Sequence, residues 1–231
     1  MPKYADITGW GKCMPPAVMT NDDMASVIET SDEWIRTRSG IRERRVSHVP
    51  ASDLAAVAGF RALAAAGADV EDVDLLVVAT CTPDTIIPST AAHVQKKMGA
   101  RNAAVFDLNA GCSGFVYSMT VVNALVRTGV YRKVLVIGAE RISWLLNWSL
   151  RDTAVLFGDG AGAVLVEPSE QESGLLASHL GCEGEALEAL LVPNFGTAGN
   201  RFVEDYRVFD VMFDGREIFR RAVKGMAQEI R

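Results

Sequence analysis

Four short apolar segments, rich in β-branched residues, constrain the fold more than any other feature. They span residues 74–80, 103–108, 133–139 and 161–167. Their apolar residues are continuous rather than alternating with polar ones, which is typical of strands covered on both faces. Helical patterns cover residues 52–66, 89–98 and 113–127. Strands that alternate with helices predict an α/β protein with a mostly parallel central sheet.

Small polar residues mark the expected helix starts. Ser52 and Ser113 are in cap positions before apolar helical patterns. Nearer the N-terminus, Thr20 and Thr30 each precede a pair of acids within three residues, which favours two short helices there. Another amphipathic helix is expected from about Gly215.

Composition and charge exclude several functional classes. Lys and Arg number 23 against 29 Asp and Glu, a net charge of −6, and no long basic block occurs, which disfavours nucleic acid as a partner. No apolar run approaches the roughly 18 to 20 residues that span a bilayer, and the N-terminus lacks the apolar core of a signal peptide. We therefore expect a cytoplasmic protein that does not enter membranes.

Cysteines and histidines are scattered along the chain. None of the four cysteines forms a closely spaced pair, and the three histidines form no His-x-x-x-His motif. This spacing predicts no metal site. A single cysteine in such a chain is usually a small buried apolar residue.

Cys112 is the cysteine whose position suggests chemistry. It directly follows an expected buried strand and begins an expected helix, within Asn109-Ala110-Gly111-Cys112-Ser113-Gly114-Phe115. A helix N-terminus offers unpaired backbone N–H groups and a positive dipole end, which favour a thiolate. From position alone, a nucleophile for acyl transfer or thiol hydrolysis and a core cysteine remain equal alternatives.

The glycine-rich stretch Phe157-Gly158-Asp159-Gly160-Ala161-Gly162 resembles a dinucleotide fingerprint only superficially. That fingerprint follows a strand and opens a helix, whereas this stretch precedes a strand. We therefore expect no nicotinamide or flavin site, and interpret the glycines as permitting close backbone packing.

Five arginines crowd one short segment around Trp34: Arg36, Arg38, Arg42, Arg44 and Arg45. A solvated loop of ion pairs and an anion-binding lip both fit this segment. Trp34 beside Arg36 and Arg38 suits a purine that bears phosphates, and equally suits a packing residue in a helical hairpin.

These motifs, taken in order, resemble β-ketoacyl-acyl-carrier-protein synthase III of the thiolase superfamily, from near residue 4 to the end of the chain. The resemblance implies a layered α-β-α-β-α sandwich of two similar halves, usually as a homodimer. Residues 1–167 would form a complete first half, 168–173 a linker and 174–231 the start of a second half. Cys112 would accept the acyl group from an acyl-CoA primer, and malonyl-acyl carrier protein would then condense with it, initiating fatty acid synthesis without a cofactor.

The resemblance also implies two binding regions. The coenzyme A mouth would consist of Trp34, Arg38, Ser39, Arg151, Gly215, Arg216 and Phe219. Ser39 and Arg216 depart from the commonest family residues. The acyl pocket would consist of Cys81, Ile87, Ile142, Leu156 and Phe157, with Ile87 reaching into the partner subunit and leaving room for primers longer than acetyl. Arg44 and Arg45 would contribute to a landing surface for the acidic carrier protein.

The stretches with which the family supplies a catalytic His and Asn do not occur before Arg231. We therefore expect a fragment or one part of a split protein, which alone accepts an acyl group without condensing it. A specialised acyltransferase or condensing enzyme of secondary metabolism, and an acyl-binding module without catalysis, are the alternatives.

Overall fold

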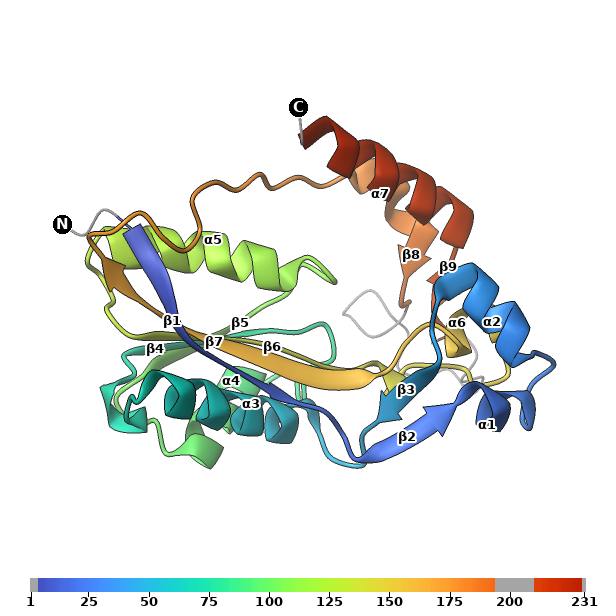
Figure 1. Ribbon diagram of the computed structural model, residues 1–231, viewed down its shortest axis with the longest axis horizontal. Helices are drawn as coiled ribbons and strands as arrows, with labels where there is room; N and C mark the ends of the chain where they lie inside the picture. The colour runs from blue at the N-terminus through green and yellow to red at the C-terminus, as the bar shows by residue number, and fades with distance from the viewer. Residues whose placement is uncertain (1–3, 194–209, 230–231) are drawn as a thin grey trace. The chain divides into compact units, whose positions relative to one another are not determined.

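The computed structural model describes residues 4–193 and 210–229 (Figure 1). The chain divides into two compact units. Unit 1 comprises Met1–Ala17, Arg45–Arg141 and Asp159–Ser178, and unit 2 comprises Val18–Arg44, Ile142–Gly158 and His179–Arg231. The expected halves at 1–167 and 174–231, with their linker, stay a prediction. The glycine- and asparagine-containing stretch at 194–201, for which the sequence predicts a loop, lies outside the described residues.

Unit 1 is built on a five-stranded sheet. Its strands, in spatial order, are β1 (Tyr4–Cys13), β7 (Asp159–Ser169), β6 (Val134–Arg141), β4 (Leu75–Ala79) and β5 (Ala104–Leu108). All four predicted strands are present. The sheet is mixed: the expected parallel arrangement holds for β4, β5 and β6, whereas β7 runs antiparallel to both β6 and β1.

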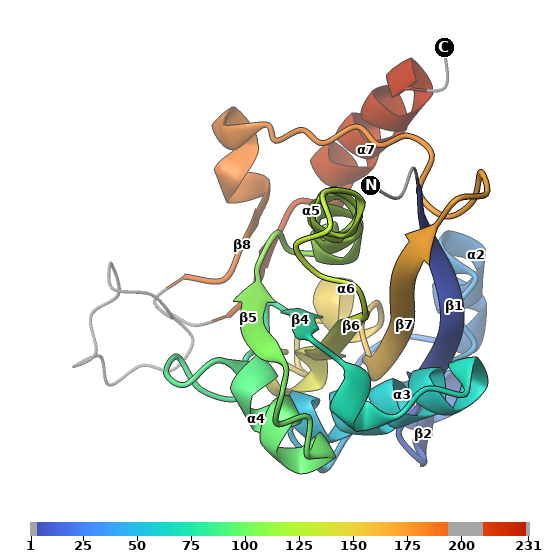
Figure 2. The same ribbon diagram turned by 90° about the vertical axis from the view of Figure 1, so that its left-hand side faces the viewer.

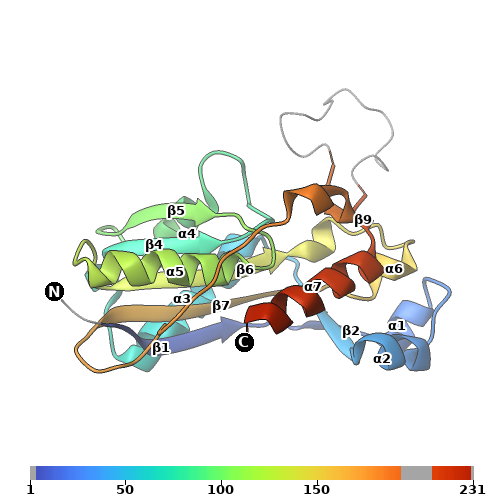
Figure 3. The same cartoon turned by 90° about the horizontal axis from the view of Figure 1, so that it is seen from above.

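Helices cover both faces of this sheet. Figure 2 shows α3 (Ala51–Ala66) and α4 (Thr90–Met98) on one face and α5 (Gly114–Arg127) on the other. From above, α5 runs along β4 and β6 (Figure 3). Alternate strand residues enter separate cores: Leu76 and Val78 pack under α3 and α4, whereas Leu75 and Val77 pack under α5. Burial of both faces explains why the apolar runs are continuous.

The helix starts agree with the sequence in part. Ser89 caps α4 by accepting a hydrogen bond from the Ala92 N–H. Ser52 does not cap α3, which begins after Pro50, and instead binds the Asp84 carboxylate through its N–H and hydroxyl. Ser113 occupies the N-cap position of α5 without a side-chain cap bond.

Close backbone packing occurs at glycines other than those predicted. A Cβ added to Gly11 in β1 would lie 2.3 Å from the Ala58 carbonyl oxygen of α3, and one added to Gly9 would lie 2.3 Å from the Ala62 carbonyl oxygen. At Gly160 and Gly162 in β7, the nearest atoms would be 3.6 and 4.0 Å away. The helix α3 therefore lies directly on β1, because β1 lacks side chains at two positions. The prediction that the glycines at 158–162 permit close backbone packing is wrong for Gly160 and Gly162.

Unit 2 contains short elements. They are α1 (Asn21–Ala25), α2 (Asp32–Ser39), the 3-10 turns at Ile142–Trp144 and Gly184–Ala189, α6 (Arg151–Ala154), the strand pair β8 (Leu190–Leu191) and β9 (Met212–Phe213), and α7 (Gly215–Glu229). The strands β2 (Ala17–Thr20) and β3 (Glu43–Val46) form a two-stranded sheet. Thr20 and Ser31 cap α1 and α2, which confirms the two predicted helix starts.

Arg44 is a buried structural residue of unit 2, only 5% exposed. Its guanidinium donates hydrogen bonds to Met19 O, Asn21 Oδ1 and Val155 O, at 3.0–3.2 Å. Burial without a carboxylate partner among these bonds lowers the pKa of Arg44. The expectation that Arg44 helps to form a landing surface is therefore wrong, since a partner protein cannot reach it.

The described helices include none that is both long and apolar enough to cross a membrane.

Candidate active site

Cys112 lies in the turn that joins β5 to α5 and is exposed. The turn is tight: the Ser113 N–H donates to Ala110 O at 3.2 Å and the Gly114 N–H donates to Gly111 O at 3.0 Å. Gly111 has φ +54°, a left-handed conformation that favours glycine. The predicted position between a strand and a helix is confirmed. The sequence therefore folds so that this thiol faces solvent at the carboxyl end of a parallel strand.

A second thiol, that of Cys81, lies at the same edge of the sheet. It is two residues beyond the end of β4, whose last residue Ala79 pairs with Leu108 of β5. The Thr80 N–H continues that pairing by donating to Leu108 O at 3.2 Å. Burial raises the pKa of Cys81 to about 12, with smaller contributions from the charges of Glu140 and Cys112. Cys81 is thus a half-buried protonated thiol beside the exposed Cys112.

Glu140, near the end of β6, is a site residue that the sequence reasoning missed. Its carboxylate accepts hydrogen bonds from the Cys81 N–H at 2.8 Å, the Thr80 hydroxyl at 3.3 Å and the Thr82 hydroxyl. The one available signal was an acid that ends an otherwise apolar strand. The sequence alone does not assign this acid a role, because it does not show that the turn after β4 lies next to Glu140.

Trp34 of α2 lies against two arginines in unit 2. The guanidinium carbon of Arg38, one turn later on α2, is 4.5 Å from the centroid of the indole ring. That of Arg151, at the start of α6, is 4.4 Å from the same centroid. Both distances fit cation–π contacts. The structure therefore brings together three of the residues predicted for one mouth, from segments far apart in sequence.

A cavity of about 480 Å³ adjoins Arg151. Its lining comes from the loop after α1, the segment around the start of α6 and the segment before α7: Ile28, Glu29, Ser149, Leu150, Arg151, Asp152, Thr153, Val211 and Phe213. Of the remaining predicted mouth residues, Gly215, Arg216 and Phe219 belong to the first turns of α7, where the Phe219 ring is 72% exposed. Ser39 ends α2, and its hydroxyl donates to Ile35 O at 2.7 Å.

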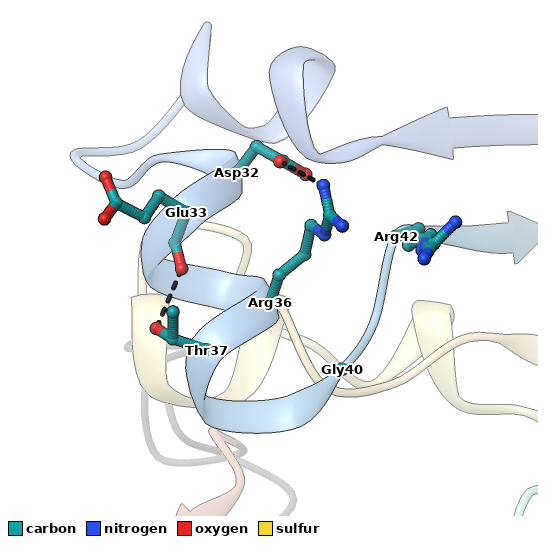
Figure 4. Close-up of a pocket in the computed structure, with 6 residues that line it drawn as sticks. All are labelled: Asp32, Glu33, Arg36, Thr37, Gly40 and Arg42. Atoms are coloured by element: carbon teal, nitrogen blue, oxygen red, sulfur yellow. Dashed lines mark hydrogen bonds and ion pairs between the residues drawn. The ribbon is translucent and has the colours of Figure 1, made fainter.

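Another hollow, of about 450 Å³, lies on the outer face of α2 (Figure 4). Arg36 pairs there with Asp32 at 3.2 Å, and hydrogen bonds from Asn21 and then Arg36 lower the pKa of Asp32. Arg42 remains exposed at its rim. The five crowded arginines thus have separate environments rather than forming one loop: Arg36 is ion-paired, Arg38 lies on Trp34 and Arg44 is buried.

The predicted acyl-pocket residues fall in both units. Cys81 and Ile87 belong to unit 1, where Ile87 is 87% exposed. Ile142, Leu156 and Phe157 belong to unit 2, where the Phe157 ring packs edge-on against Phe213 with centroids 6.0 Å apart. The pocket itself stays a prediction.

Metal-binding clusters are not a feature of this site. Within residues 4–193 and 210–229, no group of three or more His, Cys, Asp or Glu side chains is arranged to hold a metal ion.

The matching family model and the similar curated proteins carry one family name. The family model 3-oxoacyl-[acyl-carrier-protein] synthase III matches residues 106–184, which include Cys112. The β-ketoacyl-[acyl-carrier-protein] synthase III 2 of Vibrio vulnificus YJ016 is 55% identical over 96% of this chain. This chain spans 62% of that relative's length.

Two further proteins agree. The β-ketoacyl-[acyl-carrier-protein] synthase III of Roseiflexus castenholzii is 47% identical, with 98% of this chain and 70% of the relative covered. The crystal structure of 3-oxoacyl-(acyl carrier protein) synthase III from Pseudomonas aeruginosa PAO1 superposes with a TM-score of 0.89 at 37% identity, covering 99% of this chain and 69% of that one. This chain therefore belongs to the β-ketoacyl-acyl-carrier-protein synthase III family and has its thiolase-like fold.

Proposed function

We propose that this chain carries the acyl-accepting part of a condensing enzyme that initiates fatty acid synthesis. An acyl-CoA primer acylates Cys112, and malonyl-acyl carrier protein then condenses with the acyl group. The observation that carries this proposal is the exposed Cys112 thiol in the β5–α5 turn of a chain of this family. A thiolate suits both steps, because it is a strong nucleophile and a good leaving group.

The chemistry of each step follows from that thiol. In the first step the Cys112 sulfur attacks the thioester carbonyl carbon, the new carbon–sulfur bond forms, and coenzyme A leaves with the proton. In the second step malonyl-acyl carrier protein loses carbon dioxide. The resulting enolate carbon attacks the acyl-Cys112 carbonyl carbon and releases the Cys112 thiolate. Backbone N–H groups at Cys112 are the first candidates for stabilising the developing oxyanion.

Acylation of the whole chain tests this function directly. We expect intact-mass spectrometry to show a single acyl adduct after incubation with acyl-CoA, and peptide mapping to place it on Cys112. Because Ile87 is aliphatic rather than a large ring, adducts are expected to form with primers longer than acetyl. That chain-length preference would be refuted if acetyl-CoA reacts as well as the longer primers and octanoyl-CoA does not react at all. No adduct with any chain length would refute acyl transfer and favour a binding module.

Trp34, Arg38 and Arg151 form the part of the proposed coenzyme A mouth that the structure brings together. A flat ring with two guanidinium groups within 4.5 Å of its centroid suits the adenine ring and the phosphates of coenzyme A.

Trp34→Ala is expected to weaken coenzyme A binding, because stacking of a base on an aromatic ring contributes about 1 to 3 kcal/mol. This corresponds to a dissociation constant raised by a factor of roughly 5 to 150. Isothermal titration calorimetry with coenzyme A measures it. Trp10→Ala is the control, since it removes another indole ring, one that is 72% exposed and lies in β1 of unit 1. An equal loss in both variants would contradict the proposed mouth.

A homodimer is the proposed assembly. Among the described strands β5 has a neighbour, β4, on one side only, so one row of its backbone groups is open to pairing. Ile86 and Ile87, in the loop after β4, are 84% and 87% exposed. An open sheet edge and apolar side chains this exposed both fit an interface with a second copy.

A further inference from the structure

We propose that Glu140 is a positioning residue, which fastens the Thr80–Thr82 turn to the end of β6 and holds the Cys81 sulfur beside Cys112 but out of the reaction. The inference rests on the proposed role of Cys112 as acyl acceptor. It explains how one of two neighbouring thiols reacts alone.

The hydrogen bonds of this turn converge on one carboxylate. Glu140 Oε1 accepts from the Cys81 N–H, and Oε2 accepts from the Thr80 and Thr82 hydroxyls. Those hydroxyls are themselves oriented, because Thr80 Oγ1 accepts from the Thr82 N–H at 3.1 Å and Thr82 Oγ1 accepts from the Arg141 N–H at 2.8 Å. Each hydroxyl oxygen already accepts one hydrogen bond from a backbone N–H, and each hydroxyl donates its proton to Glu140.

Burial makes this network rigid. Thr80 is 4% and Thr82 8% exposed, so little water competes for their hydroxyls. Cys81 is the residue between them, and its backbone N–H is bound by the same carboxylate. Glu140, in the neighbouring strand β6, therefore sets the position of the Cys81 side chain at the carboxyl end of β4.

The charges that face Cys81 also oppose its ionisation. The titratable groups acting on its thiol are Glu140 from β6 and Cys112 from the β5–α5 turn, and both raise the pKa of Cys81 in addition to the larger effect of burial. A thiol is a far weaker nucleophile than a thiolate. Cys112 is exposed, whereas Cys81 is half-buried next to a carboxylate.

Site-resolved alkylation tests the proposal. Wild type, Glu140→Gln and Thr82→Val are treated with iodoacetamide across a range of pH, and the modification of each cysteine is followed by peptide mass spectrometry. Glu140→Gln removes the charge and one acceptor, so the alkylation rate of Cys81 is expected to rise by about tenfold near pH 9, the change that a pKa lower by one unit produces. Thr82→Val keeps the charge of Glu140 and removes two hydrogen bonds, the one to Glu140 and the one from the Arg141 N–H. Its increase is therefore expected to be smaller, and the titration of Cys81 to stay near that of wild type.

Glu167→Gln is the matched control, because Glu167 is a strand carboxylate that also accepts a threonine hydroxyl, from Thr8 at 2.6 Å, in β7 of the same sheet. It should leave Cys81 unreactive. A folded Glu140→Gln variant with the wild-type Cys81 rate, or an equal increase in Glu167→Gln, overturns the proposal. If Glu140→Gln does not fold, an unchanged Cys81 rate in Thr82→Val overturns it.

Acylation with octanoyl-CoA distinguishes a failure of this proposal from a failure of the proposed function. With octanoyl-CoA, wild type should carry the adduct on Cys112 alone, and Glu140→Gln should carry part of it on Cys81. If wild type takes no acyl group at all, the proposed function fails, whereas the alkylation contrast still decides the role of Glu140. If Glu140→Gln is acylated at Cys112 alone, Glu140 does not keep Cys81 out of acyl transfer.

Discussion

Replacing Cys112 by alanine is expected to abolish formation of the acyl adduct, with a loss of at least about a thousandfold in acylation rate. The expected loss is this large because alanine has no nucleophilic atom and no other exposed cysteine lies at this strand edge in the described part of the chain. The readout is the intact mass after incubation with the acyl-CoA that wild type accepts best. Circular dichroism checks that the variant folds.

Cys182→Ala is the control for nonspecific thiol exchange, since Cys182 is the other exposed cysteine. This variant should be acylated at the wild-type rate. An adduct that persists in Cys112→Ala and disappears in Cys182→Ala would contradict the proposed function, because acyl transfer would then reflect exposure rather than the β5–α5 turn.

Local patterns predicted those parts of the site that lie within one segment. The Cys112 turn follows from an apolar strand, small residues and a helix start, all within eleven consecutive residues. The expected burial of that strand is wrong, because β5 is an edge strand and none of its residues is fully buried. The contact between Trp34 and Arg38 is likewise visible as an i, i+4 pair on a helix. In both cases the interacting groups are close in sequence, so helix and strand periodicity suffices to place them.

Contacts between distant segments were not predictable in the same way. Arg151 reaches Trp34 only through the packing of α6 against α2 around Ile35 and Ala154. Glu140 acquires its role from a turn two strands away in sequence but adjacent in the sheet. Arg44 was taken as a surface cation because a charged residue is seldom buried, yet neutral oxygen acceptors from three segments satisfy it. Strand β1 was missed because its glycines weaken the strand pattern.

The second large effect is expected on stability, when a glycine of β1 is replaced. Gly11→Ala places a Cβ 2.3 Å from Ala58 O and 2.5 Å from Ala62 N, and both atoms belong to the backbone of α3. A flexible side chain could turn away from such a contact, but a helix backbone cannot move without displacing its whole apolar face from the sheet. α3 contributes nine buried residues, so the displacement would open the larger core of unit 1.

We therefore expect Gly11→Ala to lower the free energy of unfolding by about 3 kcal/mol or more, at or beyond the upper end of overpacking costs. For a chain of this size the thermal midpoint should fall by roughly 10 °C, as measured by circular dichroism. Gly162→Ala is the matched control, because Gly162 pairs with Lys12, the neighbour of Gly11, and its added Cβ would meet its nearest atom at 4.0 Å. That variant should stay within about 1 kcal/mol of wild type. Equal destabilisation of both would show that glycine matters here for strand flexibility and not for the approach of α3 to β1.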